Sequence, residues 1–488
     1  MRTFSIQTLG CKVNQYESEQ IATLLRSRGL IESDAESAEL RIINTCSVTT
    51  EAASKSRQAV RQMTRLPVLN SERPSVIVSG CWATSDPQEA ANIPGVDRVL
   101  THHDNVAEGL GEFLKWTADG SAKSLPLLDQ HQSKQQRAFL KIQDGCDAHC
   151  TYCIIPKLRP VLSSKPANEL LEEARRLVAA GHVELVLTGI FLSAYGQETA
   201  LRRRQSKPAK APLAQIVEML CARVTGLRRL RLSSLEPGDL DDDLLSALSS
   251  HPQVVPHFHL PLQSGSDALL RKMNRQYTRD DFLRIVDRIF QAFDRPALTT
   301  DIIAGFPGET DTEFQKTLDV VDHARFIHIH AFPFSPRPGT AAARWQGDFV
   351  RGPVVGQRID ALRERAAEFS LVFRSTFVGQ AVQLLVERNA VNYSEDRLPS
   401  SPGTPGEDRG GGSPNIEISP HPNPPPEYRR RGKSAGDSFH HGRCERYFDV
   451  HFESENVSAG DLVNVRIDRV TPTRTFGSLL SVAVQGPK

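Results

Sequence analysis

Apolar positions along the chain occur in short runs that alternate with helical patterns. In the first part of the chain three runs read as strands, Phe4–Leu9, Leu40–Thr45 and Val76–Ser79. A helix with apolar residues on one face follows the first run and ends at Gly29. Strands that alternate with helices are typical of a parallel sheet covered by helices. We therefore predict an open α/β domain in this part of the chain.

From Arg137 onward the alternation resumes, with six further strand-like runs. The six runs are Phe139–Ile142, Val183–Leu187, Leu227–Leu232, His257–Leu260, Leu298–Ile303 and Phe326–Phe332. In the clearest of the intervening helices, apolar residues recur at helical spacing from Phe282 to Phe293. Six strand–helix units are fewer than the eight of a closed barrel. The pattern predicts a partial (β/α)6 barrel.

The last part of the chain reads as all-β. Gln380–Glu387 alternates as a strand does, and strands resume at Arg446–Phe452, Leu462–Ile467 and Leu479–Val484. Residues 394–442 between them are rich in proline, glycine and serine. Such a composition buries too little apolar surface to offset chain entropy, so it predicts disorder. We expect a small β-barrel with a disordered insertion in one loop.

These patterns give the predicted domain boundaries. The boundaries are 1–118 for the α/β domain, 119–136 for a polar linker, 137–372 for the partial barrel and 373–488 for the all-β domain.

Composition and charge fit a globular protein of several domains. The chain has 488 residues, of which 39% are hydrophobic and 24% charged, and its net charge is +1. A nucleic-acid partner would therefore have to bind local basic patches. No run approaches the roughly 18 apolar residues of a membrane span, and the first residues lack the apolar core of a signal peptide. We expect a cytoplasmic protein that does not bind membranes.

Six of the eight cysteines fall into two sets of three. The compact set is Cys146, Cys150 and Cys153, and the dispersed set is Cys11, Cys46 and Cys81. Each dispersed cysteine lies one or two residues past a predicted strand. The carboxyl ends of parallel strands meet at one edge of the sheet, so we expect these three thiols to converge. The alternative is three unrelated core cysteines, which is also how we interpret Cys221 and Cys444.

The compact set follows the first barrel strand, where loops build active sites. A CxxxCxxC loop can bind three irons of a cubane cluster and leave the fourth iron without a protein ligand. The alternative is a structural zinc site with His149 as the fourth ligand.

The compact set and its barrel resemble radical S-adenosylmethionine enzymes, and nearly the whole chain outside 394–442 resembles a tRNA methylthiotransferase. The matching segments are 8–18, 44–49, 79–83, 187–190, 232–237, 259–265 and 301–310. The resemblance implies that S-adenosylmethionine chelates the open iron and is cleaved to a 5′-deoxyadenosyl radical. It also implies that the dispersed cysteines hold a second 4Fe–4S cluster, the family's site of sulfur delivery. The all-β end is similar to a TRAM domain, which is associated with tRNA binding.

The same resemblance assigns contacts and partners. It places Gly189 at the amino group of S-adenosylmethionine, and Glu236 and Gln263 at its ribose or adenine. A plain turn at Gly189 and ordinary surface residues at the other two positions are the alternatives. The implied partners are the anticodon stem-loop of tRNA and a reductant protein that supplies electrons, whereas the sulfur source is not indicated.

Two short segments indicate the branch of the family. Lys12–Gln15 and Ser47–Thr49 resemble the branch that adds a methylthio group to carbon 2 of threonylcarbamoyladenosine next to the anticodon. The alternatives are isopentenyladenosine in tRNA, a ribosomal protein side chain, and a non-catalytic RNA-binding metalloprotein. Lys157–Lys165 departs from the Arg-Gly and Ser-Arg-Ser residues common in the family, which places substrate contact there in question.

Two further patterns have ordinary explanations beside functional ones. His257 and His259 share one strand face, as do His328 and His330, because alternate strand residues point the same way. A metal site and a polar barrel interior are both compatible with that pattern. Arg57–Arg65 includes a stripe of arginines on one helix face, which suits either tRNA phosphates or solvent.

Overall fold

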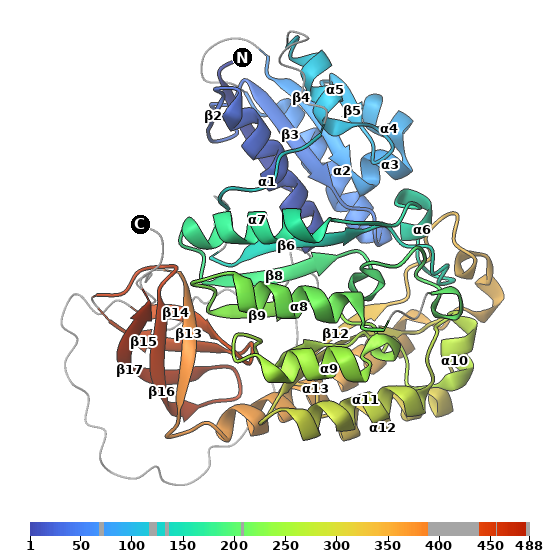
Figure 1. Cartoon of the computed structure of the whole chain (residues 1–488). Coiled ribbons are helices and arrows are strands. Elements are labelled where there is room, and N and C mark those ends of the chain that lie inside the picture. The colour runs from blue at the N-terminus through green and yellow to red at the C-terminus, as the bar shows by residue number, and fades with distance from the viewer. Residues whose placement is uncertain are drawn as a thin grey trace, which may run out of the picture.

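The structure is a computed structural model of the chain. It describes residues 1–67, 73–116, 124–131, 136–205, 209–388, 439–454 and 456–484. Three parts follow one another along the chain: an α/β domain, a larger partial barrel and a small β-barrel (Figure 1). None of the helices within these ranges is long and apolar enough to cross a membrane.

The N-terminal domain is built on a five-stranded sheet of order β2-β1-β3-β4-β5 in which all paired strands are parallel. Its strands are β1 (Thr3–Thr8), β2 (Ile31–Glu32), β3 (Leu40–Thr45), β4 (Ser75–Gly80) and β5 (Arg98–Leu100). Its helices are α1 (Lys12–Ser27), α2 (Thr50–Arg65), α3 (Cys81–Ser85), α4 (Pro87–Ala91) and α5 (Val106–Phe113). Separate apolar clusters include Ile42 and its neighbour Ile43, which point to opposite faces of the sheet. The predicted open α/β domain is confirmed.

The central domain contains the six predicted parallel strands. They are β6 (Ala138–Asp144), β8 (Glu184–Gly189), β9 (Arg229–Leu232), β10 (His257–His259), β11 (Ala297–Ala304) and β12 (His328–Pro333). They form two sheets, β7-β6-β8-β9 and β10-β11-β12, which parallel bridges Leu230–Val254 and Ser234–His259 connect. Strand β7 (Ser163–Ser164) adds an unpredicted antiparallel edge to β6. Within the described residues β12 forms no ladder with β6, so the barrel is partial, as predicted.

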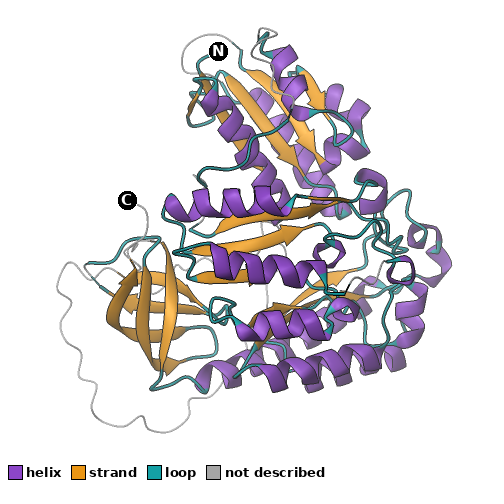
Figure 2. Cartoon of the chain, in the orientation of Figure 1, coloured by secondary structure: helices purple, strands orange, loops and turns teal. Residues whose placement is uncertain are grey.

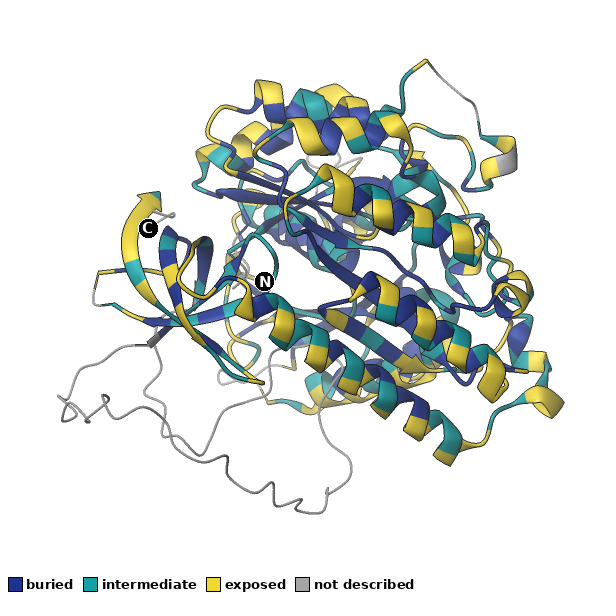
Figure 3. Ribbon diagram, turned by 90° about the horizontal axis from the view of Figure 1, so that it is seen from below, coloured by how far each residue is buried: buried dark blue, intermediate teal, exposed yellow. Residues whose placement is uncertain are grey.

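Helices cover the outside of these strands (Figure 2). They are α6 (Ile155–Leu158), α7 (Ala167–Ala179), α8 (Pro212–Arg223), α9 (Asp242–Ser250), α10 (Asp267–Lys272), α11 (Arg279–Ala292), α12 (Asp311–Ala324) and α13 (Gly352–Ser375). Short 3-10 turns are η2 (Leu192–Ala194), η3 (Arg202–Arg204), η4 (Pro237–Asp239), η5 (Ala342–Arg344) and η6 (Gln346–Asp348). Helix α11 shows why such segments are helical: Thr278 and Asp281 form a capping box, and Phe282, Ile285 and Ile289 are buried. The strands are mostly buried and the outward helix faces exposed (Figure 3).

The C-terminal domain is a closed barrel of order β13-β14-β15-β17-β16. Its strands are β13 (Ala381–Arg388), β14 (Phe439–Cys444), β15 (Asp449–Glu453), β16 (Leu462–Val470) and β17 (Thr475–Val484). Helix α13 continues to Ser375, so the predicted boundary at 372/373 lies within its last turn.

One part of the predicted disorder is wrong. Residues 439–442, the end of the predicted insertion 394–442, belong to β14, while 394–438 lie outside the described residues. His440 and Gly442 are buried, and Gly442 is paired with Val386 of β13. Histidine and glycine at inward positions removed the apolar alternation by which a strand is normally predicted.

Candidate cluster-binding site

The three dispersed cysteines lie at one edge of the N-terminal sheet. Cys11 caps α1 just after β1, Cys46 follows β3, and Cys81 begins α3 just after β4. These three strands are adjacent and parallel. A methyl group added to Gly10 would lie 3.0 Å from the Sγ atom of Cys46, so the loop before Cys11 runs directly over that thiol. The predicted convergence is confirmed.

Buried polar side chains fix the loops that carry these thiols. Asn14 donates from Nδ2 to the carbonyl oxygens of Leu9 (2.9 Å) and Thr45 (3.0 Å), which joins the first two cysteine loops. The hydroxyl of Ser56 accepts from the backbone N–H of Cys46 at 3.0 Å and donates to its carbonyl oxygen at 2.8 Å. The loops are therefore held in place by the protein itself.

The compact set lies in a tight loop after β6. Gly145 has a φ of +77°, and a side chain there would overlap with the carbonyl oxygen of Val161. Asp147 accepts from the backbone N–H of Ala200 at 2.6 Å, which ties the loop to the segment after β8. The backbone N–H of Cys153 donates to the carbonyl oxygen of Cys150 at 3.0 Å. The chain thus folds back on itself at the three thiols.

Burial changes the acid–base behaviour of several thiols. It raises the pKa of Cys46 and Cys81 above the usual range. It also raises the pKa of Cys146 and of Cys153 to about 12 in each case. Metal ligation requires thiolates, so loading either set with metal would release protons.

Arg275 is a site residue that the sequence analysis missed. It lies between α10 and α11, and its Nη1 donates to the Sγ of Cys150 at 3.3 Å. Its Nη2 donates to both carboxylate oxygens of Glu236, at 2.5 and 2.7 Å. Glu236 was predicted to contact ribose or adenine, whereas here its carboxylate binds this guanidinium. Nothing in the local pattern around Arg275 marks it, because its partners come from two distant loops.

Gly189 and Gln263 lie at the same carboxyl edge of the barrel. Gly189 ends β8 opposite Gln143, and an added side chain would lie 3.1 Å from the Oε1 of that residue. Gln263 has a φ of +61°, and its backbone N–H donates to the carbonyl oxygen of Asp301 at 2.8 Å. Both residues therefore lie at the ends of barrel strands, and the cofactor contacts that the resemblance implies remain predictions.

The two cysteine sets face one interface. Cys81 packs in an apolar cluster with Ile154 and Leu158, which follow Cys153 in the chain. Apolar contact therefore links the dispersed set of the N-terminal domain to the loop that carries the compact set.

Polar contacts hold the same interface together. Arg159, 5% exposed, binds Glu17 of α1 at 2.7 Å and Asp144 of β6 at 2.8 Å. Lys165 donates to the Tyr16 hydroxyl at 2.5 Å. The unusual segment Lys157–Lys165 thus binds the N-terminal domain to the barrel.

The loop after β12 reaches the second cysteine loop. Arg337 donates from Nη2 to the hydroxyl of Ser47 at 2.6 Å. Ser335 accepts from the backbone N–H of Thr50 at 3.1 Å. Both contacts lie within a few residues of Cys46, so the barrel also positions the dispersed set.

The donor geometry fits clusters better than single ions. In the described part of the chain, one group of three or more Cys, His, Asp or Glu residues has a ligand atom of each within 4.8 Å of the others, and it is His259, Asp301 and His330. Neither cysteine set has its three sulfurs that close together. Cysteines that bind separate irons of a cluster stand further apart than ligands of one ion. His149, the proposed fourth zinc ligand, is exposed. Three thiols in each set can therefore hold a 4Fe–4S cluster with one iron open.

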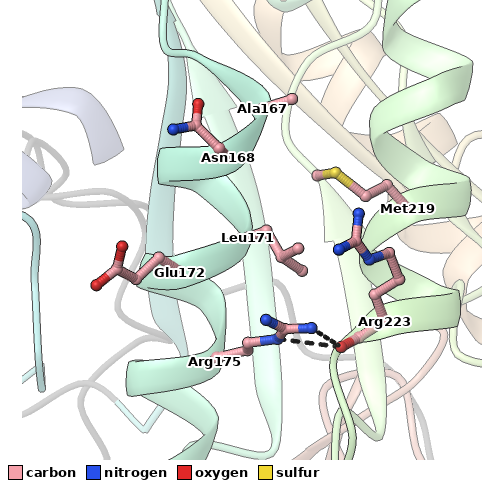
Figure 4. A pocket seen from close by; sticks show the side chains of 7 residues that line it. All are labelled: Ala167, Asn168, Leu171, Glu172, Arg175, Met219 and Arg223. Atoms are coloured by element: carbon pink, nitrogen blue, oxygen red, sulfur yellow. Dashed lines mark hydrogen bonds between the residues drawn. The ribbon is translucent and has the colours of Figure 1, made fainter.

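Two surface hollows lie away from these thiols. A groove of about 410 Å³ between α7 and α8 is lined by Leu171, Arg175, Met219 and other residues (Figure 4), none of which belongs to the predicted site. A second, of about 620 Å³, runs along α2 beside the exposed Arg61 and Arg65.

Family models match two parts of the chain. The Radical SAM superfamily matches residues 140–321, and Uncharacterized protein family UPF0004 matches residues 3–101. The first match spans most of the partial barrel, and the second the five-stranded sheet with its three cysteines.

Curated relatives match over most of their length. The chain is 35% identical to threonylcarbamoyladenosine tRNA methylthiotransferase MtaB of Thermotoga maritima over 398 residues, covering 79% of this chain and 87% of the relative. The chain belongs to the tRNA methylthiotransferase family. It is therefore a transferase of the radical S-adenosylmethionine superfamily. S-Adenosylmethionine and a 4Fe–4S cluster, the cofactors that this membership implies, fit the compact cysteine loop.

Relatives with two different names have similar identities to this methylthiotransferase. MtaB of Bacillus subtilis is 33% identical over 427 residues, covering 82% of this chain and 88% of the relative. tRNA-2-methylthio-N(6)-dimethylallyladenosine synthase 1 of Mycobacterium marinum is 36% identical over 402 residues, covering 79% and 75%. Among solved structures, the radical S-adenosylmethionine methyltransferase TsrM of Kitasatospora setae has a TM-score of 0.51 and 14% identity, covering 70% of this chain and 77% of that one. That likeness shows the fold alone.

Proposed function

We propose that this methylthiotransferase adds a methylthio group to carbon 2 of threonylcarbamoyladenosine, next to the anticodon in tRNA. The observation that carries the proposal is the contact of Cys81 with Ile154 and Leu158, directly after Cys153. Two thiol sets on one interface suit a reaction that needs radical formation and sulfur delivery at the same base. The relatives named MtaB support the substrate.

In this proposal each cysteine set holds a different cluster. Cys146, Cys150 and Cys153 hold the cluster that binds S-adenosylmethionine, and Cys11, Cys46 and Cys81 hold the second 4Fe–4S cluster. When bound, these groups supply the radical and methyl-transfer chemistry. Gly189, Glu236 and Gln263 line the cofactor's side of the barrel, with Arg275 fixing Glu236 beside Cys150.

Lys12 favours the threonylcarbamoyl substrate over the dimethylallyl one. It follows Cys11 directly, and its half-buried side chain interacts electrostatically with Tyr447 and Asp301. A threonylcarbamoyl group carries a carboxylate, whereas a dimethylallyl group is apolar. A half-buried ammonium group next to Cys11 can pair with the carboxylate of the first group. The apolar second group would remove water from this ammonium group without offering it a counter-charge.

The partners follow from the same proposal. The substrate is the anticodon stem-loop of tRNA, and the C-terminal barrel acts as a TRAM domain that contacts it. Exposed Arg61 and Arg65 on α2 offer a basic stripe for phosphates. A reductant protein delivers electrons to the cluster, and the reaction takes place in the cytoplasm.

Mass spectrometry of tRNA nucleosides from a deletion strain tests the substrate. We expect loss of methylthiolated threonylcarbamoyladenosine and accumulation of the unmodified nucleoside. The wild-type gene should restore the modification, and Cys146→Ala should not. Loss of the methylthiolated dimethylallyladenosine (isopentenyladenosine) instead would assign the chain to the other branch.

Anaerobic reconstitution tests the chemistry separately. We expect about eight irons per chain, four for each of two 4Fe–4S clusters, together with reductive cleavage of S-adenosylmethionine. Cys11→Ala should halve the iron content and leave the cleavage. A chain that takes up zinc and cleaves nothing would be a non-catalytic RNA-binding metalloprotein.

A further inference from the structure

Three side chains on neighbouring strands meet at a second point, apart from both cysteine sets. They are His259 at the end of β10, Asp301 in β11 and His330 in β12. One donor atom of each lies within 4.8 Å of the other two. The strand register explains the convergence, because Asp301 is paired directly with His330, and His259 with Thr299.

These side chains point into the barrel. Alternate residues of a strand point to opposite faces of its sheet. Phe258, Ile302 and Ile329, each next to one of the three donors, belong to the apolar core shared with the outer helices. The donors therefore occupy the inner face.

The spacing suits ligands of one ion. The Nε2 of His259 lies 3.3 Å from the Oδ2 of Asp301. Two ligands that each stand about 2.1 Å from a first-row metal ion are about 3.0–3.4 Å apart at octahedral to tetrahedral angles. This pair is therefore already at the separation that a shared ion requires.

The second nitrogen of each ring has a partner outside the proposed site. Nδ1 of His259 lies 3.0 Å from the hydroxyl of Thr299, and Nδ1 of His330 lies 3.2 Å from Nε2 of His328. Metal-binding histidines are usually oriented by such a hydrogen bond at the nitrogen that does not bind the ion. In His259 the nitrogen that faces Asp301, Nε2, is thereby left for the ion.

We propose that His259, Asp301 and His330 form a mononuclear site for a divalent first-row transition metal. Two imidazoles and one carboxylate suit ions such as Zn²⁺, Mn²⁺ or Fe²⁺, whereas Mg²⁺ and Ca²⁺ favour oxygen ligands alone. Three protein ligands leave at least one coordination position open to the barrel interior.

The site lies close to the cofactor residues. Ser234 is paired with His259, and Glu236 follows two residues later in the chain. The backbone N–H of Gln263 also donates to the carbonyl oxygen of Asp301. The proposed ion therefore lies near the strand ends that carry Glu236 and Gln263. The metal site does not depend on which nucleoside is modified.

The competing arrangement is a hydrogen-bonded network without metal. In that arrangement the Asp301 carboxylate accepts a hydrogen bond from Nε2 of His259 and is attracted by the half-buried ammonium group of Lys12. Such a network satisfies the carboxylate but would not select a transition metal. Metal binding therefore distinguishes the two arrangements.

Zinc binding to the cluster-loaded full chain tests the proposal. The anaerobically reconstituted protein is dialysed against ZnCl₂ alone, zinc and iron are quantified, and X-ray absorption is recorded at the zinc edge. We expect one zinc per chain with a nitrogen and oxygen shell. His259→Gln and His330→Gln should each weaken this binding at least about tenfold. The control His323→Gln, at an exposed histidine paired with Asp287 on α11, should leave it unchanged.

Three outcomes would overturn the proposal: no retained zinc, a shell made of sulfur alone, or equal zinc in wild type and both variants. Iron content and thermal midpoint show whether each variant is folded. The absorption spectrum of the wild-type protein needs no substitution, so it decides the question even if a variant fails to fold. Dialysis against MnCl₂ then tells whether the site prefers the harder ion.

Discussion

Arg159→Met should weaken the interface between the N-terminal domain and the barrel. The guanidinium binds Glu17 and Asp144 within 2.8 Å, and its side chain is 4% exposed. Methionine keeps the apolar stem but leaves both carboxylates with Lys141, which binds them at 2.7 and 2.6 Å. The variant therefore leaves one cation for two largely buried anions.

The magnitude follows from the cost of an uncompensated buried charge. Removing one partner of a buried ion pair typically destabilises a protein by about 3–5 kcal/mol. Because Lys141 remains, we expect the lower figure, about 3 kcal/mol. For a cooperative unit comprising the first two domains, this corresponds to a drop of about 4 °C in the thermal midpoint.

The effect should depend on pH in a defined direction. Burial alone would raise the pKa of Glu17, but Arg159 and then Lys141 hold it well below its usual range. The pKa of Asp144 is lowered too, since Lys141 and Arg159 outweigh its burial. Carboxylates with lowered pKa values stabilise the fold above their unfolded pKa, and the stabilisation is lost as the pH falls. The difference between wild type and variant should therefore be largest near neutral pH and shrink below about pH 4.

Thermal unfolding of the anaerobically reconstituted full chain measures this effect, with iron content as a check on loading. The matched control is Arg176→Met, which removes an exposed ion pair with Glu172 on α7. Exposed pairs contribute about 0–1 kcal/mol, so the control should barely change the midpoint. If Arg159→Met behaves like the control at neutral pH, the reasoning about this interface is refuted.

Three further predictions concern other buried charges. Burial would raise the pKa of Glu184, but Arg231 and Arg229 hold it at about 2. Between pH 6 and pH 3, the wild-type protein should therefore lose about 2 kcal/mol more stability than Glu184→Gln, as measured by denaturant titrations. Burial would likewise raise the pKa of Tyr447, but Arg443 and other cations lower it to about 7. Tyrosinate absorption should appear near that pH in the wild-type protein and be missing there in Tyr447→Phe. The wild-type protein should also gain stability relative to the variant from pH 7 to pH 10. Arg275→Met removes a positive charge next to Cys150. It should lower the reduction potential of the bound cluster by tens of millivolts in an electron paramagnetic resonance titration. An unchanged potential would contradict the assigned contact.

Much of the fold and the cysteine sites could be predicted from the sequence. The run Leu40–Thr45 is strand β3 with the same bounds, because its apolar residues Leu40, Ile42 and Ile43 mark a buried strand even though Arg41, Asn44 and Thr45 are polar. The convergence of Cys11, Cys46 and Cys81 followed from their positions just past adjacent parallel strands. Local pattern and one rule of sheet topology were sufficient for both.

Contacts between distant loops could not be predicted in this way. Arg275 reaches Glu236 and Cys150 across 39 and 125 positions of the chain, and no periodicity encodes such a distance. The side-chain contact of His259 with Asp301 likewise depends on β10 and β11 being neighbours in the sheet. The alternation of strand residues indicated that histidines on one strand share a face. That the Asp301 carboxylate lies close to His259 and His330 became apparent only from the register of the strands.

The bonds from Ser335 and Arg337 to Thr50 and Ser47 have a consequence for RNA access. They fasten the rim of the barrel to the loop of Cys46 in the free protein. An adenine stacked inside an anticodon loop must then leave its neighbours and enter singly, at an energetic cost of a few kcal/mol. The nucleotides on either side of this adenine would then have to move, and no hinge motion between the protein domains would be needed.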